Sequence, residues 1–278
     1  MRDFHFIFGL RPQTEAFHLL HFLCLESCRQ LHPQARIHLH YRNLPWGEWW
    51  DRIAPFLNLR PVGNDPVAGF DPGRYRQTAE GRMIEQAGTT YAHEADFLRL
   101  QILLAEGGCY ADMDTLFVQP YPDRFFDAEF AMGEESSFIG ESGLLRPSLC
   151  NAVMFARPGA HFVSEWLTQM AAVFDGTWNR HSCFEAARLW ERMPESILVL
   201  PRNYFYRYGW SQREIVTLFE SCDPVLHHDL YSIHLWAHLW WSETRRDFTA
   251  FHAGMITPEF LRTANTTFAT LARRFLPA

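Results

Sequence analysis

The chain has 278 residues, and 47% of them are hydrophobic, which is enough for one domain with a sizeable core. Its formal net charge is −7, so polymeric nucleic acid, which binds basic surfaces, is a poor partner. All 25 basic residues are arginine, and this excludes chemistry that needs a lysine, such as a Schiff base or a phosphate-binding P-loop.

The six cysteines, at positions 24, 28, 109, 150, 183 and 222, form no C-x-x-C pair. This spacing argues against a structural zinc site and predicts buried thiols in a reducing compartment. The N-terminus lacks a basic region followed by an apolar run, and no run of about eighteen apolar residues occurs. The sequence therefore predicts neither a secretory signal nor a membrane span.

The first third of the chain predicts a β-α-β unit. Residues 4–8 form an apolar strand that ends at Gly9, and residues 37–41 and 57–62 predict two further strands. A helix is predicted to open at Pro12, between the first two strands. This order implies a parallel sheet, in which ligands bind at the carboxyl ends of the strands.

Two such strand ends, Phe8-Gly9 and Tyr41-Arg42, are expected to border one crevice. Core packing explains Phe8 equally well. The connection that follows the third strand, residues 64–90, is rich in Gly, Pro and Asp and has no clear period. It is predicted to be long and irregular.

The most informative stretch is residues 92–120. Its first half predicts a helix with one apolar stripe, and Asp96 and Arg99 share a different face because they lie three residues apart. Gly107-Gly108 ends this helix, as a left-handed cap does. A short strand is predicted to follow, and it carries a D-x-D sequence.

Asp112 and Asp114 are expected to leave this strand on the same side, because they are two residues apart. Carboxylates so close repel each other unless a cation joins them, and a hard divalent ion, Mg²⁺ or Mn²⁺, suits them. A D-x-D sequence alone is a weak signal, and its alternative reading is a solvated turn.

The surrounding residues strengthen the signal. The stretch resembles the sugar-nucleotide glycosyltransferases with a DXD sugar-binding region, a group that includes initiating mannosyltransferases, α1,4-galactosyl- and N-acetylglucosaminyltransferases, and the glucosylating clostridial toxins. Their pattern, S/A-D-x-x-R-x-x-x-L-x-x-x-G-G-x-Y-x-D-x-D, is matched throughout by Ala95, Asp96, Arg99, Leu103, Gly107, Gly108, Tyr110, Asp112 and Asp114.

The resemblance implies an α/β fold of the GT-A type, with a mixed, mainly parallel sheet flanked by helices. It implies a single domain over 1–278, with a nucleotide-sugar half (1–120) and an acceptor half with C-terminal helices (121–278). The implied reaction is metal-dependent and retaining. It moves a hexose from a nucleoside diphosphate sugar, UDP first and GDP second, to a hydroxyl of a glycan, lipid-linked or protein acceptor, as in polysaccharide biosynthesis.

The resemblance also implies roles for single residues. Phe8, Gly9 and Tyr41 would hold the nucleotide, and Asp96 and Arg99 would contact the sugar or the phosphates. Asn151 would face the reacting sugar; as an amide at a strand start, it is equally explained by capping a turn.

A second motif, H-x-W, lies near the C-terminus. In the resembled family its His completes the coordination of the ion or contacts the diphosphate, and its Trp packs on the same site; here these are His234 and Trp236. A neutral imidazole is a good ligand for Mn²⁺ beside carboxylates. Because the chain has 14 histidines, a structural role for His234 is the alternative, and His238 is the nearest competitor for the motif position.

The second half of the chain predicts further elements. Its acidic loop, with Glu134, Glu135 and Glu141, is placed to meet an acceptor or is simply solvated, and its aromatic segment stacks on sugars or packs in the core. The expected elements are strands at 130–132, 149–155, 197–200 and 231–236, helices at 161–174, 182–192 and 258–276, the acidic loop at 133–148 and the aromatic segment at 203–210.

Two other classes of protein have similar residues. In haloacid-dehalogenase phosphatases the Thr comes two residues after the second Asp of the motif, in the first strand, whereas Thr115 is adjacent to Asp114 in a late strand, so that match fails. A non-catalytic protein that binds sugar nucleotides or glycans uses the same residues as an enzyme and stays open. The lack of an N-terminal anchor favours a cytoplasmic, bacterial enzyme or a trimmed chain, with peripheral membrane contact left open.

Overall fold

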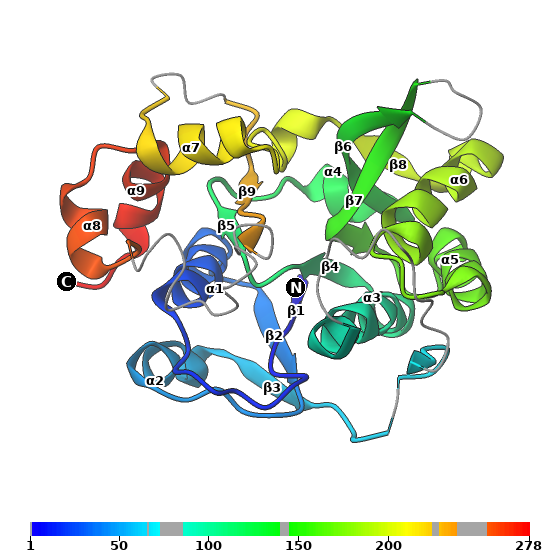
Figure 1. Cartoon of the computed structure of the whole chain (residues 1–278), viewed down its shortest axis with the longest axis horizontal. Helices are drawn as coiled ribbons and strands as arrows, with labels where there is room; N and C mark the ends of the chain where they lie inside the picture. The colour runs from blue at the N-terminus through cyan, green and yellow to red at the C-terminus, as the bar shows by residue number, and fades with distance from the viewer. Residues whose placement is uncertain (1, 66, 73–85, 140–144, 224–227, 238–254) are drawn as a thin grey trace.

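The computed structural model describes residues 2–65, 67–72, 86–139, 145–223, 228–237 and 255–278. Its centre is a seven-stranded sheet with the order β3-β2-β1-β4-β7-β6-β8 (Figure 1). The strands are β1 Asp3–Ile7, β2 Arg36–Tyr41, β3 Asn58–Pro61, β4 Gly108–Ala111, β6 Phe130–Ile139, β7 Leu145–Ala156 and β8 Leu198–Leu200.

Parallel pairs outnumber antiparallel ones in this sheet. The pairs β1–β2, β2–β3, β1–β4 and β6–β8 are parallel, whereas β4–β7 and β6–β7 are antiparallel. The expected α/β class with a mixed, mainly parallel sheet flanked by helices is therefore confirmed. The division of the chain into donor and acceptor halves stays a prediction.

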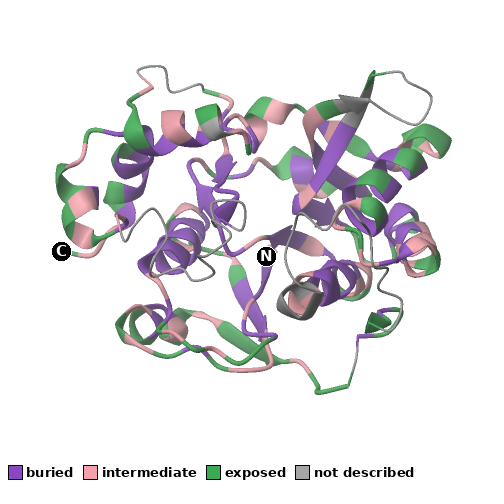
Figure 2. Ribbon diagram, viewed as in Figure 1, coloured by how far each residue is buried: buried purple, intermediate pink, exposed green. Residues whose placement is uncertain are grey.

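Helices cover both faces of the sheet. They are α1 Leu19–Leu31, α2 Glu48–Ile53, α3 Gln86–Glu106, α4 Asp123–Asp127, α5 His161–Val173, α6 Glu185–Arg192, α7 Gln212–Glu220, α8 Pro258–Thr263 and α9 Thr267–Ala272. Alternate residues of a strand point to opposite faces. Phe6 of β1 and Cys109 of β4 accordingly pack in the core cluster of α1, and Ile7 and Tyr110 pack in that of α3. Figure 2 shows the resulting buried centre, with β1, β4 and β7 between exposed outer helices.

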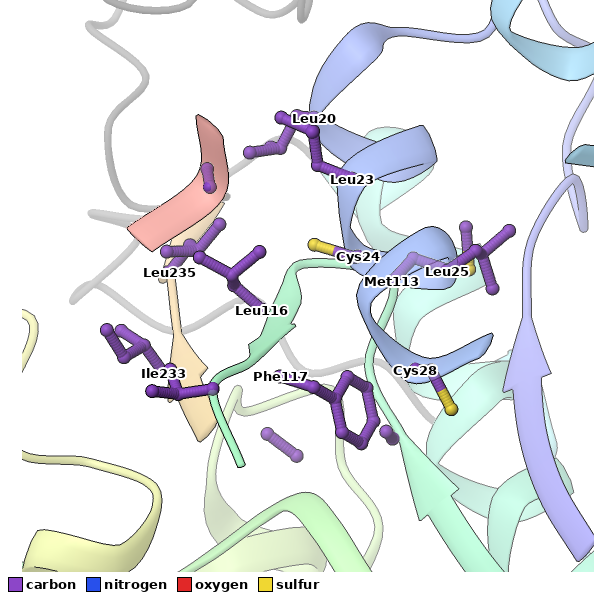
Figure 3. Close-up of a cluster of buried hydrophobic side chains, with 14 of the residues drawn as sticks. Leu20, Leu23, Cys24, Leu25, Cys28, Met113, Leu116, Phe117, Ile233 and Leu235 are labelled. Atoms are coloured by element: carbon purple, nitrogen blue, oxygen red, sulfur yellow. The ribbon is translucent and has the colours of Figure 1, made fainter. Parts of the chain in front are cut away.

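A second, two-stranded sheet pairs segments that are far apart in the sequence. β5 (Thr115–Phe117) lies antiparallel to β9 (Ser232–His234), with Thr115 opposite His234. Figure 3 shows apolar side chains of α1 directed toward this pair, among them Leu20 and Leu23 near Leu116 and Leu235. Burial of this apolar surface holds β9 against the chain that follows β4.

The structure corrects several predicted boundaries. The first helix begins at Leu19 rather than at Pro12, because the side chain of His18 accepts a hydrogen bond from the backbone N–H of Leu20 and caps it there. Helix α3 begins at Gln86, inside the segment predicted to be irregular. Gly107, with φ +71°, ends that helix as predicted, and its backbone N–H bonds Leu103 O at 2.9 Å.

Two corrections concern the second half. The predicted loop 133–148 is instead mostly strand: β6 and β7 pair through it, with register shifts after Met132 and Glu134 that break the alternation expected of a strand. The predicted helix 258–276 is split into α8 and α9, because the Thr266 side chain accepts from Ala269 N and starts a new helix. Five cysteines are buried as expected, but Cys222 is exposed.

One face of β1 and β2 carries a histidine cluster that sequence reasoning did not single out. His5 and His40 are buried, and His5 Nδ1 lies 3.1 Å from His40 Nε2. His38 stacks on His5 and lies 2.8 Å from Asp3, which also pairs with Arg36. Burial lowers the pKa of His5 to about 4 and that of His40 to about 3, so both rings are neutral in the folded protein at neutral pH.

Candidate active site

A cavity of about 550 Å³ opens beside the carboxyl ends of β1 and β4. Its walls come from the segment after β1, from α3, from the turn after β4 and from β7, with the chain after β9 closing one side. Ligands of open α/β sheets bind at this edge. Most of the sequence-predicted site residues line it, namely Phe8, Gly9, Asp96, Arg99, Asp112, Asp114, Glu135, Asn151, His234 and Trp236.

The sequence analysis placed the D-x-D sequence on a strand. In the structure it lies instead in the turn between β4 and β5. Thr115 N bonds Asp112 O at 3.0 Å, and this bond closes the turn. Asp112 N is held by Ala152 O of β7 at 2.8 Å, so the neighbouring strand fixes where the turn begins. The two carboxylates therefore converge because the main chain reverses between them, and not because of the two-residue period of a strand.

His234 reaches both carboxylates from β9. Its Nε2 lies 3.2 Å from Asp114 Oδ1 and 3.7 Å from Asp112 Oδ2. One ligand atom from each of the three side chains falls within a 4.8 Å cluster. The β5–β9 pairing explains this approach, since Thr115 lies opposite His234, and Leu235 N bonds Asp114 O at 2.9 Å.

The fit to a divalent cation can be judged from the donor atoms. Asp114 Oδ2 accepts a hydrogen bond from Ala237 N at 2.8 Å. Asp112 Oδ2 and Asp114 Oδ1 are the carboxylate oxygens that lie near His234 Nε2. Two carboxylate oxygens and one imidazole nitrogen suit Mn²⁺ or Mg²⁺, with further positions for substrate oxygens and water. The residues therefore fit the expected ion.

The electrostatics of the cluster are those of close carboxylates. Burial raises the pKa of Asp112, and the neighbouring Asp114 adds to this against the opposing effects of Arg99 and His234. Burial lowers the pKa of His234, but the two aspartates outweigh it, so the net pKa is raised.

Asp96 and Arg99 are buried in the cavity wall and do not form a surface pair. Arg99 Nη2 lies 3.1 Å from Asp96 Oδ1, and Arg99 Nη1 lies 3.2 Å from Asp112 Oδ1. The same guanidinium donates to Asn151 O at 3.0 Å and lies over the ring of Tyr110, whose hydroxyl donates to Asp112 Oδ1 at 2.6 Å. Arg99 thus joins the helix half of the motif to its D-x-D half.

Asp96 has two partners besides Arg99. Asn151 lies within β7, not at its start as predicted, and its side-chain N–H donates to Asp96 Oδ1 at 2.8 Å. His181 Nε2 lies 3.0 Å from Asp96 Oδ2. Burial raises the pKa of Asp96, but Arg99 and His181 outweigh it, so the pKa is held below its usual range and the carboxylate stays charged.

His181 was missed by sequence reasoning. It is fully buried and sits on a π-helix, Arg180–Phe184, which precedes α6 and which also brings Ser182 and Cys183 to the cavity. One-turn π-helices often occur at functional sites. The sequence offers no clear signal for this residue, because His181 is one of 14 histidines and lies outside the matched motif.

The predicted nucleotide-binding residues are only partly together. Phe8 lines the cavity while its ring packs edge-on against Phe17 and His21, and its role in nucleotide binding stays a prediction. Gly9 has φ +74°, and a Cβ there would lie 2.1 Å from Asn43 O, so only glycine fits. Tyr41 is not among the described residues that line the cavity, and its role stays a prediction.

Trp236 and the acidic segment complete the site. Trp236 leaves the strand with φ +54°, and its ring centroid lies 4.2 Å from that of His234, with Nε1 donating to Tyr208 O at 2.9 Å. Glu135 lines the cavity from β6, whereas Glu134 is not among its described lining residues. Glu141 and His238 lie outside the described residues.

The site thus combines a cavity at the strand ends of a mixed α/β sheet with an Asp–Asp–His cluster at its wall. Residues 21–131 match the family described as "Glycosyltransferase sugar-binding region containing DXD motif". These residues therefore carry the sugar-binding region of a DXD glycosyltransferase, as the resemblance predicted.

Among curated proteins, the chain is similar to "Glucan organizing enzyme 1" of Cryptococcus neoformans var. grubii, at 27% identity over 98% of this chain and 69% of that protein. It is also similar to "Subversion of eukaryotic traffic protein A" of Legionella pneumophila, at 28% identity over 41% of this chain and 16% of that protein. One relative is fungal and one bacterial, so these likenesses do not support the expectation of a bacterial source.

Among solved structures, the chain is similar to the galactosyltransferase LgtC in complex with donor and acceptor sugar analogues. The TM-score is 0.47, with 14% identity over 98% of this chain and 93% of that chain. It is also similar to the PaToxG glycosyltransferase, with a TM-score of 0.45 and 16% identity over 69% of this chain and 70% of that one. Within the described part of the chain, no helix combines the length and the apolar character that crossing a bilayer requires.

Proposed function

We propose that the chain is a metal-dependent, retaining glycosyltransferase that moves a hexose from a nucleoside diphosphate sugar to a glycan hydroxyl. The observation that carries this proposal is the convergence of Asp112, Asp114 and His234 at one wall of the cavity, within 4.8 Å of one another. Mn²⁺ or Mg²⁺ held there would offset the charge that develops on a diphosphate leaving group.

The chain's own residues supply positioning and charge. Arg99 is a fixed cation beside Asp112, and its planar guanidinium suits contacts with sugar or phosphate oxygens. Asp96 is held charged by its partners and can accept hydrogen bonds from sugar hydroxyls. Asn151 fixes Asp96 and faces the same cavity. Trp236, against His234, would shield the diphosphate from water and favour transfer over hydrolysis.

Retention of configuration is proposed to come from front-side attack, in which the leaving phosphate assists the acceptor. The alternative, a covalent intermediate, needs a carboxylate placed on the far face of the sugar. The preference for UDP over GDP rests on the family resemblance, and an acceptor in polysaccharide biosynthesis is suggested by the name of the glucan-organizing relative. A cytoplasmic location likewise stays a prediction.

A screen of donors tests the proposal. UDP-glucose, UDP-galactose, UDP-N-acetylglucosamine and GDP-mannose are each added with and without MnCl₂, and both the melting temperature and the release of free sugar are followed. We expect one donor to raise the melting temperature and to be hydrolysed slowly, both only with metal. Binding without turnover, in the presence of glycan acceptors as well, would favour a binding protein over an enzyme.

A further inference from the structure

One wall of the cavity carries an exposed tryptophan that donor binding does not explain. Trp210 lines the cavity, and 53% of its surface is exposed, whereas Trp236 beside the Asp–Asp–His cluster is 6% exposed. A large ring left open to water at the rim of a pocket is typical of ligand-binding surfaces, since an apolar ring in a packed core is covered.

The backbone on both sides of Trp210 is anchored. Before it, Tyr208 O accepts the hydrogen bond from Trp236 Nε1 at 2.9 Å. After it, the Ser211 side chain caps α7 by accepting from Glu214 N, and the Glu214 carboxylate pairs with Arg202 at 2.6 Å. The exposed position of the ring is therefore fixed by the fold.

A carboxylate lies next to this ring. Glu135 reaches the cavity from β6, and the indole of Trp210 is close enough to favour its charged form, although burial raises the pKa of Glu135 on balance. Glu135 is also close enough to His234 for the two charges to interact, so it connects the exposed ring to the Asp–Asp–His end of the cavity. A carboxylate accepts several hydrogen bonds, so Glu135 can also accept one from a bound ligand.

We propose that Trp210 and Glu135 form the acceptor subsite, and that the acceptor is a pyranose-containing glycan. The C–H face of a pyranose ring stacks on the indole, and a hydroxyl next to the one to be glycosylated donates to Glu135. This inference rests on the proposed function and specifies its acceptor, which the D-x-D half of the site leaves undefined.

The transfer step balances with these residues. The acceptor oxygen forms a bond to the anomeric carbon of the donor, and the bond from that carbon to the diphosphate oxygen breaks. The electron pair of the broken bond leaves with the diphosphate, which also takes the proton of the acceptor hydroxyl. Glu135 orients the acceptor sugar by accepting a hydrogen bond from the neighbouring hydroxyl, and it is unchanged by the reaction.

The test compares Trp210→Ala with Trp46→Ala. Trp46 is a matched control because 52% of its surface is exposed and it does not line the described cavity. The probes are laminaritriose and p-nitrophenyl β-D-glucopyranoside as glycans and a serine-containing peptide as a non-sugar acceptor. The acceptor KM and the binding of laminaritriose by saturation-transfer NMR are measured, and the donor Kd is measured with Mn²⁺ and no acceptor.

For Trp210→Ala we expect the KM for the glycans to rise about tenfold or more, equivalent to about 1.4 kcal/mol, with the donor Kd changed less than about twofold. Trp210→Phe keeps a stacking face and should recover most of the loss. This variant also allows the test to be made if Trp210→Ala folds poorly. Glu135→Gln should lower kcat more than it raises the acceptor KM, because orientation of the hydroxyl matters most in the transition state.

Three results would overturn the inference. They are an unchanged acceptor KM in Trp210→Ala, a donor Kd that weakens as much as the acceptor KM, and transfer to the peptide but to neither glycan. Failure of the proposed function itself is distinguishable, because the wild-type protein would then bind none of the four nucleotide sugars with Mn²⁺.

Discussion

The guanidinium of Arg99 lies 3.2 Å from the carboxylate of Asp112, although the two residues belong to different elements, helix α3 and the turn after β4. Both groups are held in the cavity wall, and Arg99 is only 6% exposed. Through this contact the helix part of the motif, on α3, supplies a positive charge to the D-x-D turn and helps to hold that turn in place.

Replacing Arg99 by methionine should cost stability as well as activity. The substitution leaves Asp96 and Asp112 without their cation in a buried site, and breaking such a pair from one side costs about 3–5 kcal/mol. Urea unfolding of the metal-free protein measures this loss. Arg99→Lys should recover less than half of it, because one ammonium cannot reach Asp96, Asp112 and Asn151 O together. If the urea midpoint of Arg99→Met is unchanged, the contacts of Arg99 with the two aspartates do not stabilise the fold.

Asp112→Asn and Asp114→Asn should each lower metal-dependent turnover by at least about 100-fold. Loss of a group that only hydrogen-bonds to a metal ligand already costs up to about 100-fold, and loss of a ligand itself should cost at least as much. Each change removes a charge that would hold the cation. The matched control is Asp51→Asn, an exposed aspartate on α2, which should turn over normally. The measurement is donor hydrolysis across a range of Mn²⁺ concentrations; near-normal turnover by either site variant would contradict the ion site.

His234→Ala should weaken donor binding strongly when Mn²⁺ is present and much less when metal is absent. The imidazole supplies one of three ligand atoms in the cluster, so its loss matters most when a cation links protein and diphosphate. Isothermal titration with the nucleotide sugar, with and without Mn²⁺, measures the difference. Equal loss in both conditions would make His234 a structural residue.

His181→Phe should reduce both stability and donor affinity without touching the cavity surface. The ring fills the same buried space but leaves Asp96 Oδ2 without its partner at 3.0 Å, and a hydrogen bond to a charged group contributes about 1.5–3 kcal/mol. The expected result is a lower urea midpoint and a higher donor Kd, with the pH optimum unchanged. His181→Asn, which restores a donor, should recover part of both.

The histidines of β1 and β2 predict loss of stability in acid. An unfolded histidine has a pKa near 6.5, whereas His5 and His40 titrate at about 4 and about 3 in the folded chain. Between these values the unfolded state binds more protons. Stability is therefore full above about pH 6.5 and falls as the pH is lowered toward 4, by roughly 3 kcal/mol for each of the two histidines. His40→Leu should flatten this part of the stability–pH curve, as followed by thermal unfolding.

The sequence predicted the local half of the site well. Asp96, Arg99, the Gly107 cap and the D-x-D turn lie within twenty residues, where helical spacing and glycine conformation are readable, and the family motif defines their order. The strand assigned to Asp112 and Asp114 was wrong, because a turn of three residues between two short strands has no periodicity to reveal it.

The remaining site residues depend on contacts that no local pattern encodes. Asn151 meets Asp96 only because β7 inserts beside β4, and His181 meets it only through a π-helix that follows α5. Glu135 was placed in a loop because the bulges of β6 hide its strand period, and its neighbour Trp210 comes from a segment 75 residues later. The pairing of β7 with β4 and the register of β6 are set by tertiary packing.

The pairing of β5 with β9 has a consequence for the synthesis of the chain. Asp112 and Asp114 leave the ribosome long before His234, and β9 pairs with β5 only when Ser232–His234 has been made. Contacts between residues so distant in sequence form late, because the intervening chain must first be ordered. A growing chain therefore carries a complete D-x-D turn but no third side chain beside it, and the cluster closes only after more than four-fifths of the polypeptide has been translated.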